Sequence, residues 1–318
     1  MTTIKWGILS AGKIAHQFCQ DMAFVNNGEL QAVAARQLEN AKSFAEQYKI
    51  PSYYQGYQAL FDDPNVDAIY IATPHTFHFE NTRDALLAGK HVLCEKPVTV
   101  TPIQLQELIE LAKERQLFFM EAMWTYFLPA VQTAKLWVEQ GRIGALKHIK
   151  ADFGYPVPYD PEGRMHNPDL AGGCLFDMGI YSLAIANFFT TGQLQSPSVH
   201  CSFALSGVDN DVLITARCDD IILSLGTSFQ CKLKNSALII GDKGYIELPN
   251  FWKANECQLY ELDNCIDHFQ DHRRSLGYNY ETAAVGEMIA QGKLQHPTMP
   301  HEQSMLLQKQ IEQIRASF

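Results

Sequence analysis

The sequence lacks the features of secreted, membrane-spanning and nucleic-acid-binding proteins. Its eight cysteines are scattered and form no CxxC pair, so no disulfide framework is indicated. No run approaches the roughly 20 apolar residues of a membrane-spanning helix, and the N-terminus has no basic segment followed by an apolar one. Positive charge is in deficit, with 25 Lys and Arg against 35 Asp and Glu, which disfavours binding to nucleic acid or anionic membrane. We therefore expect a cytoplasmic protein.

The first part of the chain alternates strands with helices. With 318 residues, of which 47% are hydrophobic, the chain is long enough for about two domains. Strand-like runs occupy 4–9, 30–35, 68–72, 91–94 and 117–120, and the clearest helices lie near 77–88 and 102–115. This alternation predicts a doubly wound parallel sheet of the Rossmann type, covered by helices on both faces. We assign residues 1–122 to this dinucleotide-binding domain.

The second part of the chain contains strands that follow one another without helices between them. Strands are indicated within 146–156, 197–207, 211–229, 236–248 and 257–263, and GDKG (241–244) is typical of a hairpin turn. Helices are expected near 176–189, 279–291 and 301–316, and the charged stretch DHFQD (267–271) is expected to be a solvated loop. We therefore predict an antiparallel sheet in an α+β domain spanning residues 123–318.

A nucleotide-binding loop follows the first strand. The stretch from Ser10 to Ala15 matches the fingerprint G-x-G-x-x-G/A, with Ser10 in place of the first glycine. Gly12 allows the backbone to approach a pyrophosphate, and Ala15 allows the helix to pack closely on the strand. The first N–H groups of the helix, at Lys13 and Ile14, can then bind the phosphates. An ordinary tight turn is the alternative interpretation.

The end of the second strand indicates which dinucleotide binds. NAD sites usually carry Asp or Glu there, where it binds the 2′-hydroxyl of the ribose. This chain instead has Arg36, and a guanidinium at that position favours the 2′-phosphate of NADP. We therefore expect NADP rather than NAD, although a solvated surface arginine would give the same pattern.

Two further strand ends carry polar side chains. The run Ala72-Thr73-Pro74-His75 follows one strand, and Cys94-Glu95-Lys96-Pro97 follows the next. Ligands of open α/β sheets bind at these carboxyl ends, so Lys96 is a candidate for proton exchange. His75 and His78 lie three residues apart, but no further ligands complete a metal site.

A third group of polar residues lies in the second domain. Asp177 and Tyr181 are four residues apart and therefore share one face of an otherwise apolar helix. A carboxylate on a buried helix needs a cationic or hydrogen-bonding partner, and we expect Lys96 to be that partner.

These segments together resemble the Gfo/Idh/MocA family of oxidoreductases. The matching stretches are the 10–15 loop, ATPH (72–75) with His78, AGKHVLCEKP (88–97) and AGGCLFDMGIY (171–181), and the similarity covers essentially the whole chain. Within the family, EAMWTYFLP (121–129) and Tyr181 are most similar to the branch of dimeric dihydrodiol dehydrogenases and NADP-dependent D-xylose dehydrogenases. Many relatives carry Arg where this chain has Tyr126, which points to a different substrate pocket.

The resemblance implies a Rossmann domain joined to a domain with a large open antiparallel sheet, which often serves as a dimer interface. It implies that Lys96 contacts nicotinamide ribose and the substrate hydroxyl, and that a cis peptide bond precedes Pro97. Lys96 and Tyr181 are the candidates for proton transfer, with Asp177 orienting or polarising. Substrate contacts are expected from Trp124, Phe153 and Arg164, although Trp124 also fits core packing and Arg164 a surface charge. The predicted cofactor-binding residues are Ser10, Gly12, Lys13, Ile14, Arg36, Thr73, Pro74, His75, His78, Glu95 and Lys96.

The predicted activity is that of an NADP-dependent oxidoreductase. It would transfer a hydride between the cofactor and a secondary alcohol of a sugar, a polyol or a cyclic trans-diol. Two other functions fit parts of the sequence: an NADP-binding sensor without catalysis, and an NAD-dependent glycosidase of the same superfamily. Lys96 together with Asp177 and Tyr181 argues against the sensor, and Arg36 argues against the glycosidase.

Overall fold

The computed structural model describes residues 2–190 and 193–318, which fall into two compact units. Unit 1 comprises Met1–Trp124 with Arg274–Met305, and unit 2 comprises Thr125–Arg273 with Leu306–Phe318. The domains expected from the sequence, 1–122 and 123–318, differ from these units because residues 274–305 return to unit 1. We describe each unit by itself.

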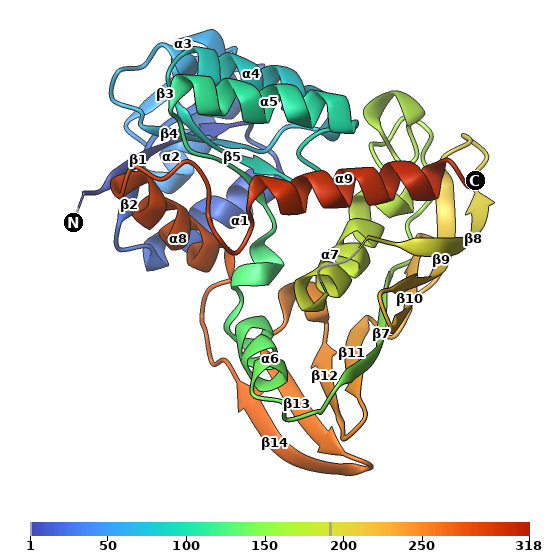
Figure 1. Cartoon of the computed structure of the whole chain (residues 1–318). Helices are drawn as coiled ribbons and strands as arrows, with labels where there is room; N and C mark the ends of the chain where they lie inside the picture. The colour runs from blue at the N-terminus through green and yellow to red at the C-terminus, as the bar shows by residue number, and fades with distance from the viewer. Residues whose placement is uncertain (1, 191–192) are drawn as a thin grey trace. The chain divides into compact units, whose positions relative to one another are not determined.

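Unit 1 is built on a six-stranded parallel sheet with the order β3-β2-β1-β4-β5-β6, the arrangement of Rossmann domains. In Figure 1, helices α3, α4 and α5 lie on one side of these strands, and α1 and α8 lie on the other. The expected Rossmann-type sheet is confirmed, and a short strand, β3, joins the five that the sequence predicted. The strands are β1 (Ile4–Leu9), β2 (Gly28–Ala35), β3 (Ser52–Gln55), β4 (Ala68–Ile71), β5 (His91–Glu95) and β6 (Phe119–Ala122). The helices are α1 (Lys13–Asp21), α2 (Leu38–Tyr48), α3 (Gln58–Phe61), α4 (His78–Leu87), α5 (Pro102–Arg115) and α8 (Tyr278–Ala290), with short helices η1 (Met22–Phe24), η2 (His75–Phe77) and η3 (Trp124–Phe127), the last beginning at the final residue of the unit's first segment.

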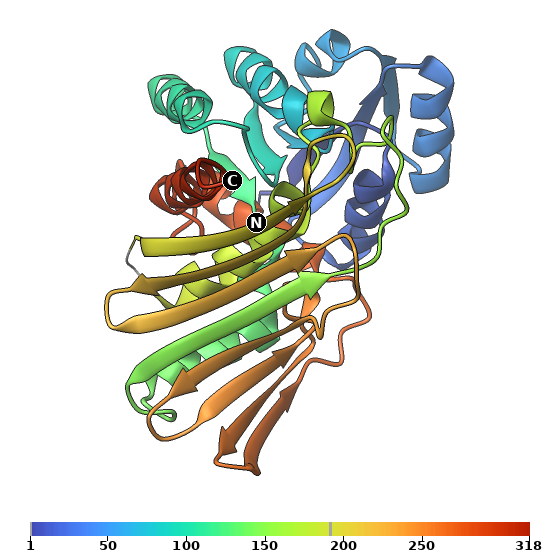
Figure 2. The same cartoon turned by 90° about the vertical axis from the view of Figure 1, so that its right-hand side faces the viewer.

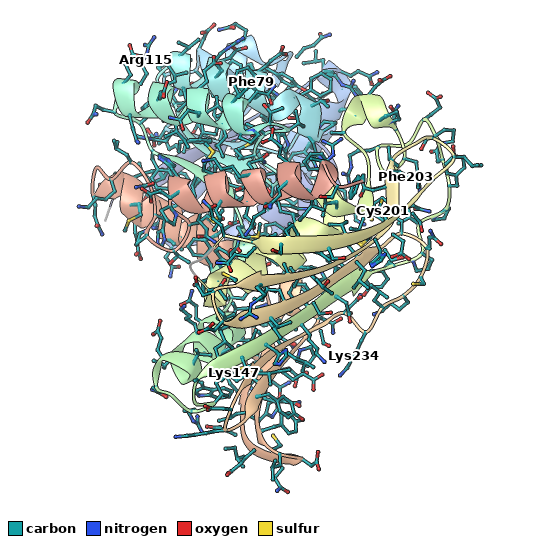
Figure 3. All side chains as sticks on the ribbon, turned by 45° about the vertical axis from the view of Figure 1, so that its right-hand side comes forward. Phe79, Arg115, Lys147, Cys201, Phe203 and Lys234 are labelled. Atoms are coloured by element: carbon teal, nitrogen blue, oxygen red, sulfur yellow. The ribbon has the colours of Figure 1, made fainter. Side chains whose placement is uncertain are left out.

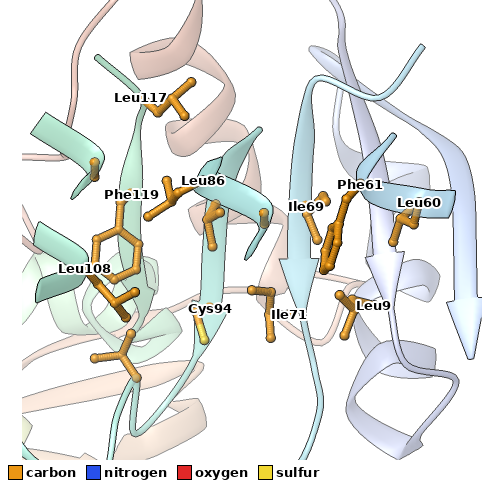
Figure 4. Close-up of a cluster of buried hydrophobic side chains, with 14 of the residues drawn as sticks. Leu9, Leu60, Phe61, Ile69, Ile71, Leu86, Cys94, Leu108, Leu117 and Phe119 are labelled. Atoms are coloured by element: carbon orange, nitrogen blue, oxygen red, sulfur yellow. The ribbon is translucent and has the colours of Figure 1, made fainter. Parts of the chain in front are cut away.

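A continuous apolar core lies between this sheet and helices α3, α4 and α5. Ile69 and Ile71 of β4, Leu86 of α4 and Leu108 of α5 are completely buried there (Figure 4). All four residues of β4 are buried, as expected for a central strand covered on both faces. Helix α5 begins as the sequence predicts, because the Thr101 side chain accepts a hydrogen bond from the Gln104 N–H.

Unit 2 is built on an eight-stranded sheet with the order β14-β13-β12-β11-β7-β10-β9-β8. The pairs are antiparallel except for β7 and β10, which run parallel. Figure 2 looks onto the face of this sheet that no helix of the unit covers, and Figure 3 labels Lys147 on β7 and Cys201 and Phe203 on β8. The strands are β7 (Leu146–Gly154), β8 (Gln195–Phe203), β9 (Asp209–Cys218), β10 (Ile221–Ser228), β11 (Ser236–Gly241), β12 (Tyr245–Pro249), β13 (Glu256–Glu261) and β14 (Asn264–Gln270).

The expectation of a solvated loop at 267–271 is wrong. These residues belong largely to β14, which pairs antiparallel with β13 at the edge of the sheet. Every residue of β14 is exposed or half-exposed, so its sequence shows charged residues instead of an apolar alternation. His268 contacts Glu256 on β13 at 2.9 Å, and Asp267 accepts a hydrogen bond from Arg142 at 2.6 Å.

Helices α6 (Pro129–Glu139) and α7 (Ile180–Phe189) contact this sheet, and α9 (His301–Arg315) contributes its last turns to unit 2. One turn of π-helix, η5 (Leu175–Gly179), leads into α7, and a short helix, η4 (Pro168–Leu170), precedes it. The stretch 168–189 is long and apolar enough to cross a membrane by length and composition, and 72% of its most apolar window is buried inside the structure. That burial is the behaviour of a core helix of a globular domain.

Candidate functional site

The glycine loop of unit 1 leaves the end of β1 and starts α1 at Gly12, which occupies the N-cap position. Ser10 has a φ of 108°, in the region that favours glycine, and its hydroxyl accepts a hydrogen bond from the Gly12 N–H at 3.2 Å. A Cβ added to Gly12 would meet only the Ser10 hydroxyl, at 3.4 Å, so the backbone is open to a close approach. Ala15 is completely buried, as the fingerprint requires, while Lys13 is exposed and Ile14 half-buried. The loop therefore fits a pyrophosphate.

Arg36 is exposed directly after β2 ends at Ala35. Tyr57 lies close enough for the Arg36 charge to act on its phenol, whose pKa is nevertheless raised because burial outweighs that charge. The next residue, Gln37, is uncharged, so neither of the two residues that follow β2 is a carboxylate. The end of β2 therefore presents a cation, and no carboxylate, to a bound nucleotide.

The ends of β4 and β5 are tied together by the first turn of α4. Thr73 and His75 are buried, and Pro74 is the N-cap of η2. The Thr73 hydroxyl accepts a hydrogen bond from Asn81 at 3.0 Å. His78 is completely buried, and its two ring nitrogens lie 2.8 Å from the carbonyl oxygens of Pro97 and Thr73. His78 thus bridges the loops that carry the predicted cofactor-binding residues.

Lys96 follows the last residue of β5 and is 8% exposed. The Lys96–Pro97 peptide bond is cis, as the family resemblance implied. Because β5 ends at Glu95, Lys96 lies at the carboxyl end of the sheet. Glu95 is half-buried beside it and accepts hydrogen bonds from the Tyr70 hydroxyl and, at 3.3 Å, from the Lys96 N–H.

Two buried glutamates beside this loop were not predicted from the sequence. Burial raises the pKa of the Glu121 carboxyl to about 7, opposed by hydrogen bonds from Val98 and Ser304 and by the Lys96 charge. Burial also raises the pKa of Glu281 well above its usual value, and neither of its oxygens has a hydrogen-bond partner among the described residues. Glu121 follows the run LFFM at the end of a strand, a signal that could have identified it, whereas nothing in the sequence marks Glu281.

Trp124, predicted to form a wall for the substrate, is 7% exposed. Its ring stacks on Tyr278 with the centroids 4.5 Å apart and the planes 8° from parallel. Tyr278 begins α8, and its hydroxyl donates to Gln17 at 3.2 Å. The structure therefore gives Trp124 a packing partner within unit 1.

Asp177 lies in the π-helical turn of unit 2, a feature that often accompanies functional sites. Its carboxylate accepts a hydrogen bond from Arg164 at 2.9 Å, and the two form an ion pair. Within unit 2, Arg164 is a cationic partner of Asp177. The pairing of Asp177 with Lys96 that the sequence led us to expect joins residues of the two units and stays a prediction. Just before this turn, Gly173 allows Asp209 to pack closely, because a Cβ on Gly173 would lie 2.3 Å from a carboxylate oxygen of Asp209.

Tyr181 is buried near the start of α7, beside a group of aromatic rings. The ring of Phe153, on β7, lies 5.8 Å from the ring of Tyr181 and stacks on Trp252 at 4.0 Å. Tyr155 completes this group, edge-on to Trp252. The structure therefore brings together Phe153 and Tyr181, two of the site residues predicted from the sequence. The sequence analysis did not identify Trp252, in the short helix η6 (Phe251–Lys253), as part of this group.

Unit 2 also contains a surface groove of about 710 Å³. It is lined mainly by the 156–159 segment, His166, the hairpin at 203–205 and residues 229–230. Phe153, Asp177 and Tyr181 do not line it, so we do not assign it to the catalytic residues. Among residues 2–190 and 193–318, no three His, Cys, Asp or Glu side chains lie together as metal ligands would.

Comparison with known families agrees with this architecture. Residues 4–123 match the model described as "Oxidoreductase family, NAD-binding Rossmann fold", and residues 131–247 match the "GFO/IDH/MocA C-terminal domain". The chain belongs to the Gfo/Idh/MocA family of oxidoreductases. It is a nicotinamide-dependent dehydrogenase, as the sequence predicted.

Several Gfo/Idh/MocA proteins are similar to this chain over nearly its whole length. It is 32% identical to trans-1,2-dihydrobenzene-1,2-diol dehydrogenase of Mus musculus and 33% identical to that of Homo sapiens, each match covering 98% of this chain and 96% of the relative. Among solved structures, an aldose-aldose oxidoreductase from Caulobacter crescentus complexed with glycerol matches with a TM-score of 0.89 at 23% identity, covering 99% of this chain and 97% of that one. A 3-ketoreductase from Actinomadura kijaniata in complex with NADP matches with a TM-score of 0.88 at 23% identity, covering 99% and 98%. The similarity to these two solved structures, at 23% identity, shows the fold alone.

Proposed function

We propose that this dehydrogenase uses NADP to interconvert a secondary alcohol and a ketone on a cyclic diol or a sugar. The observation that carries the proposal is the position of Lys96, buried at the carboxyl end of β5 before a cis proline. In open α/β sheets this edge holds the ligands, so Lys96 is placed for chemistry on a bound substrate.

The preference for NADP rests on Arg36. Its guanidinium is exposed at the end of β2, where a planar cation can pair with the 2′-phosphate of the adenine ribose through two hydrogen bonds. The open backbone at Gly12 and the N-terminus of α1 would hold the pyrophosphate. When bound, the nicotinamide supplies the hydride transfer.

The chain's own residues handle the proton. In the oxidation direction, the hydroxyl proton of the substrate passes to Tyr181 or Lys96, and in the reduction direction the same group returns it. Asp177 orients the substrate or its proton acceptor, and Arg164 holds the Asp177 carboxylate in place at 2.9 Å. This assignment requires Lys96 and Tyr181 to act on the same substrate.

The aromatic group around Tyr181 supports a cyclic substrate. Phe153 lies beside the Tyr181 ring and stacks face to face on Trp252, so the surroundings of Tyr181 are aromatic and apolar, as suits a substrate with an apolar ring face. The relatives named trans-1,2-dihydrobenzene-1,2-diol dehydrogenase suggest a cyclic diol as the first substrate to test. A pyranose also presents an apolar face, which keeps sugars in the same class.

The test is a panel of alcohols with NADP⁺ or NAD⁺, followed by the absorbance of the reduced nicotinamide. The panel contains trans-1,2-dihydrobenzene-1,2-diol, D-xylose, glucose and inositol. We expect reduction of NADP⁺ with at least one of them and a weaker reaction with NAD⁺. Cofactor binding without any turnover would favour the sensor, and release of free sugar from a glycoside without net reduction would favour the glycosidase.

We further propose that the chain forms a homodimer through the uncovered face of the unit 2 sheet. Leu213 on β9 and Ile222 on β10 lie on this face and are 44% and 45% exposed. All eight cysteines are free, which supports a cytoplasmic location. Sedimentation at micromolar protein concentration, compared with that of Leu213→Lys, tests the dimer.

A further inference from the structure

The peptide group between Pro97 and Val98 is held at both of its ends. The carbonyl oxygen of Pro97 lies 2.8 Å from Nδ1 of His78, and the Val98 N–H donates to Oε1 of Glu121 at 2.9 Å. His78 is the first residue of α4 and Glu121 lies in β6, so side chains of two different elements contact the two ends of one peptide group. This plane directly follows Lys96 and its cis bond to Pro97.

The second ring nitrogen of His78 determines how many protons the ring carries. Nε2 lies 2.8 Å from the carbonyl oxygen of Thr73. A carbonyl oxygen only accepts hydrogen bonds, and a neutral imidazole has a single N–H to donate. If one nitrogen were bare, its lone pair would face a carbonyl oxygen at hydrogen-bond distance in a completely buried site. Both contacts are attractive only when both nitrogens carry a proton.

Another buried histidine of unit 1 provides a contrast. His301 donates from Nε2 to the carbonyl oxygen of Phe119 at 2.9 Å, and its Nδ1 has no hydrogen-bond partner among the described residues. One N–H satisfies this environment, and burial lowers the pKa of His301. His78 and His301 therefore differ in the number of carbonyl groups that their rings must satisfy.

We propose that His78 is a buried imidazolium that joins the loops after β4 and β5 and, together with Glu121, positions Lys96. His78 is a positioning residue, because it acts on Lys96 through the Pro97–Val98 peptide. Glu121 accepts the hydrogen bond from the Val98 N–H whether or not its carboxyl is protonated, so this contact does not depend on the charge of Glu121. Besides His78, the titratable side chains on the elements that meet around this peptide are Glu80, Arg83 and Asp84 of α4, His75 of η2, His91, Cys94 and Glu95 of β5, Lys96 after β5, and Glu121 of β6.

The protonation of His78 can be measured directly. We would label the histidines of the full-length protein with ¹⁵N, record proton–nitrogen correlations of the rings at neutral pH, and assign His78 and His301 from His78→Gln and His301→Gln. We expect two protonated nitrogens for His78 and one for His301. A bare nitrogen on His78 would overturn the proposal. Neutron diffraction from crystals of the unaltered protein gives the same answer if His78→Gln does not fold.

The effect on Lys96 is tested by kinetics, and this part rests on the proposed function. A glutamine donates from one end only, so His78→Gln can hold one of the two carbonyl groups, whereas His301→Gln can keep its single bond. We expect His78→Gln to lower kcat by about ten- to a hundred-fold with little change in the Kd of NADP⁺, and His301→Gln to change kcat little. An unchanged kcat in His78→Gln would overturn the positioning role. If the unaltered protein turned over no alcohol, the proposed function would fail, and the ring protonation would still be decided by the spectra.

Discussion

Ser10 offers a test of how the nucleotide loop works, because it occupies a glycine position without being glycine. Its φ of 108° strains a residue with a Cβ by about 1–2 kcal/mol. The hydrogen bond from the Gly12 N–H to its hydroxyl, at 3.2 Å, offsets about 0.5–1.5 kcal/mol of that strain. The same bond occupies an N–H group that the fingerprint reserves for phosphate.

Two substitutions separate these effects. Ser10→Ala keeps the strain and loses the hydrogen bond, so the free energy of unfolding should fall by about 0.5–1.5 kcal/mol. Ser10→Gly also loses the bond but relieves the strain, at an entropic cost of about 0.5–1 kcal/mol, so its stability should stay within about 1 kcal/mol of the unaltered chain. Both substitutions release the Gly12 N–H from its hydrogen bond, and each should tighten NADP⁺ binding by up to about tenfold, or 1.4 kcal/mol.

The assay is fluorescence titration with NADPH, combined with urea unfolding of the same three proteins. If both substitutions weakened binding, the Ser10 hydroxyl would itself contact the cofactor, and the reasoning would be refuted. If Ser10→Gly were less stable than Ser10→Ala, the strain at φ 108° would not be real.

Three further predictions concern single side chains. Asp21 accepts hydrogen bonds from the N–H groups of residues 276–278 at 2.7–2.8 Å at the start of α8, so Asp21→Ala should lower the free energy of unfolding by about 2–4 kcal/mol. Urea unfolding checks this against Asp220→Ala, whose side chain is 99% exposed and whose effect should stay below about 0.5 kcal/mol. Because burial raises the pKa of Glu281, its contribution to stability is full below the unfolded pKa and is lost as pH rises. The free energy of unfolding of Glu281→Gln, measured in urea titrations, should therefore increase relative to that of the unaltered chain from about pH 5 to pH 8. A difference that does not change with pH would contradict the raised pKa of Glu281. Arg36→Glu should shift the ratio of kcat/KM from NADP⁺ toward NAD⁺ by about tenfold or more, and an unchanged ratio would show that Arg36 does not touch the phosphate.

The order of elements in unit 1 could be predicted because its signals are local. Helix α5 has its cap at Thr101, its proline at 102 and its apolar stripe within one stretch of sequence, and the structure begins and ends it at Pro102 and Arg115 as expected. The strands β1 and β4 are buried on both faces, so each is a continuous apolar run that predicts a strand. The short strand β3 and the edge strand β14 have no such run, and they were missed.

The contacts that could not be predicted join residues far apart in the sequence. The return of residues 274–305 to unit 1 depends on Asp21 capping α8 across about 255 residues, which no local pattern reveals. The glycine loop and the Lys96 motif were found because each carries its own fingerprint. The pairing of Arg164 with Asp177 and the burial of Glu281 depend on packing alone, so only the structure could identify them.

The role of Lys96 can be tested most directly by comparing Lys96→Met with the unaltered protein in two measurements. Methionine has a similar length but carries no charge and no exchangeable proton. With NADP⁺ and the best alcohol of the panel, we expect turnover to be abolished while the Kd of NADPH, measured by fluorescence, stays within a few-fold. Turnover at the unaltered rate would contradict the assignment of Lys96 to the chemistry of this dehydrogenase.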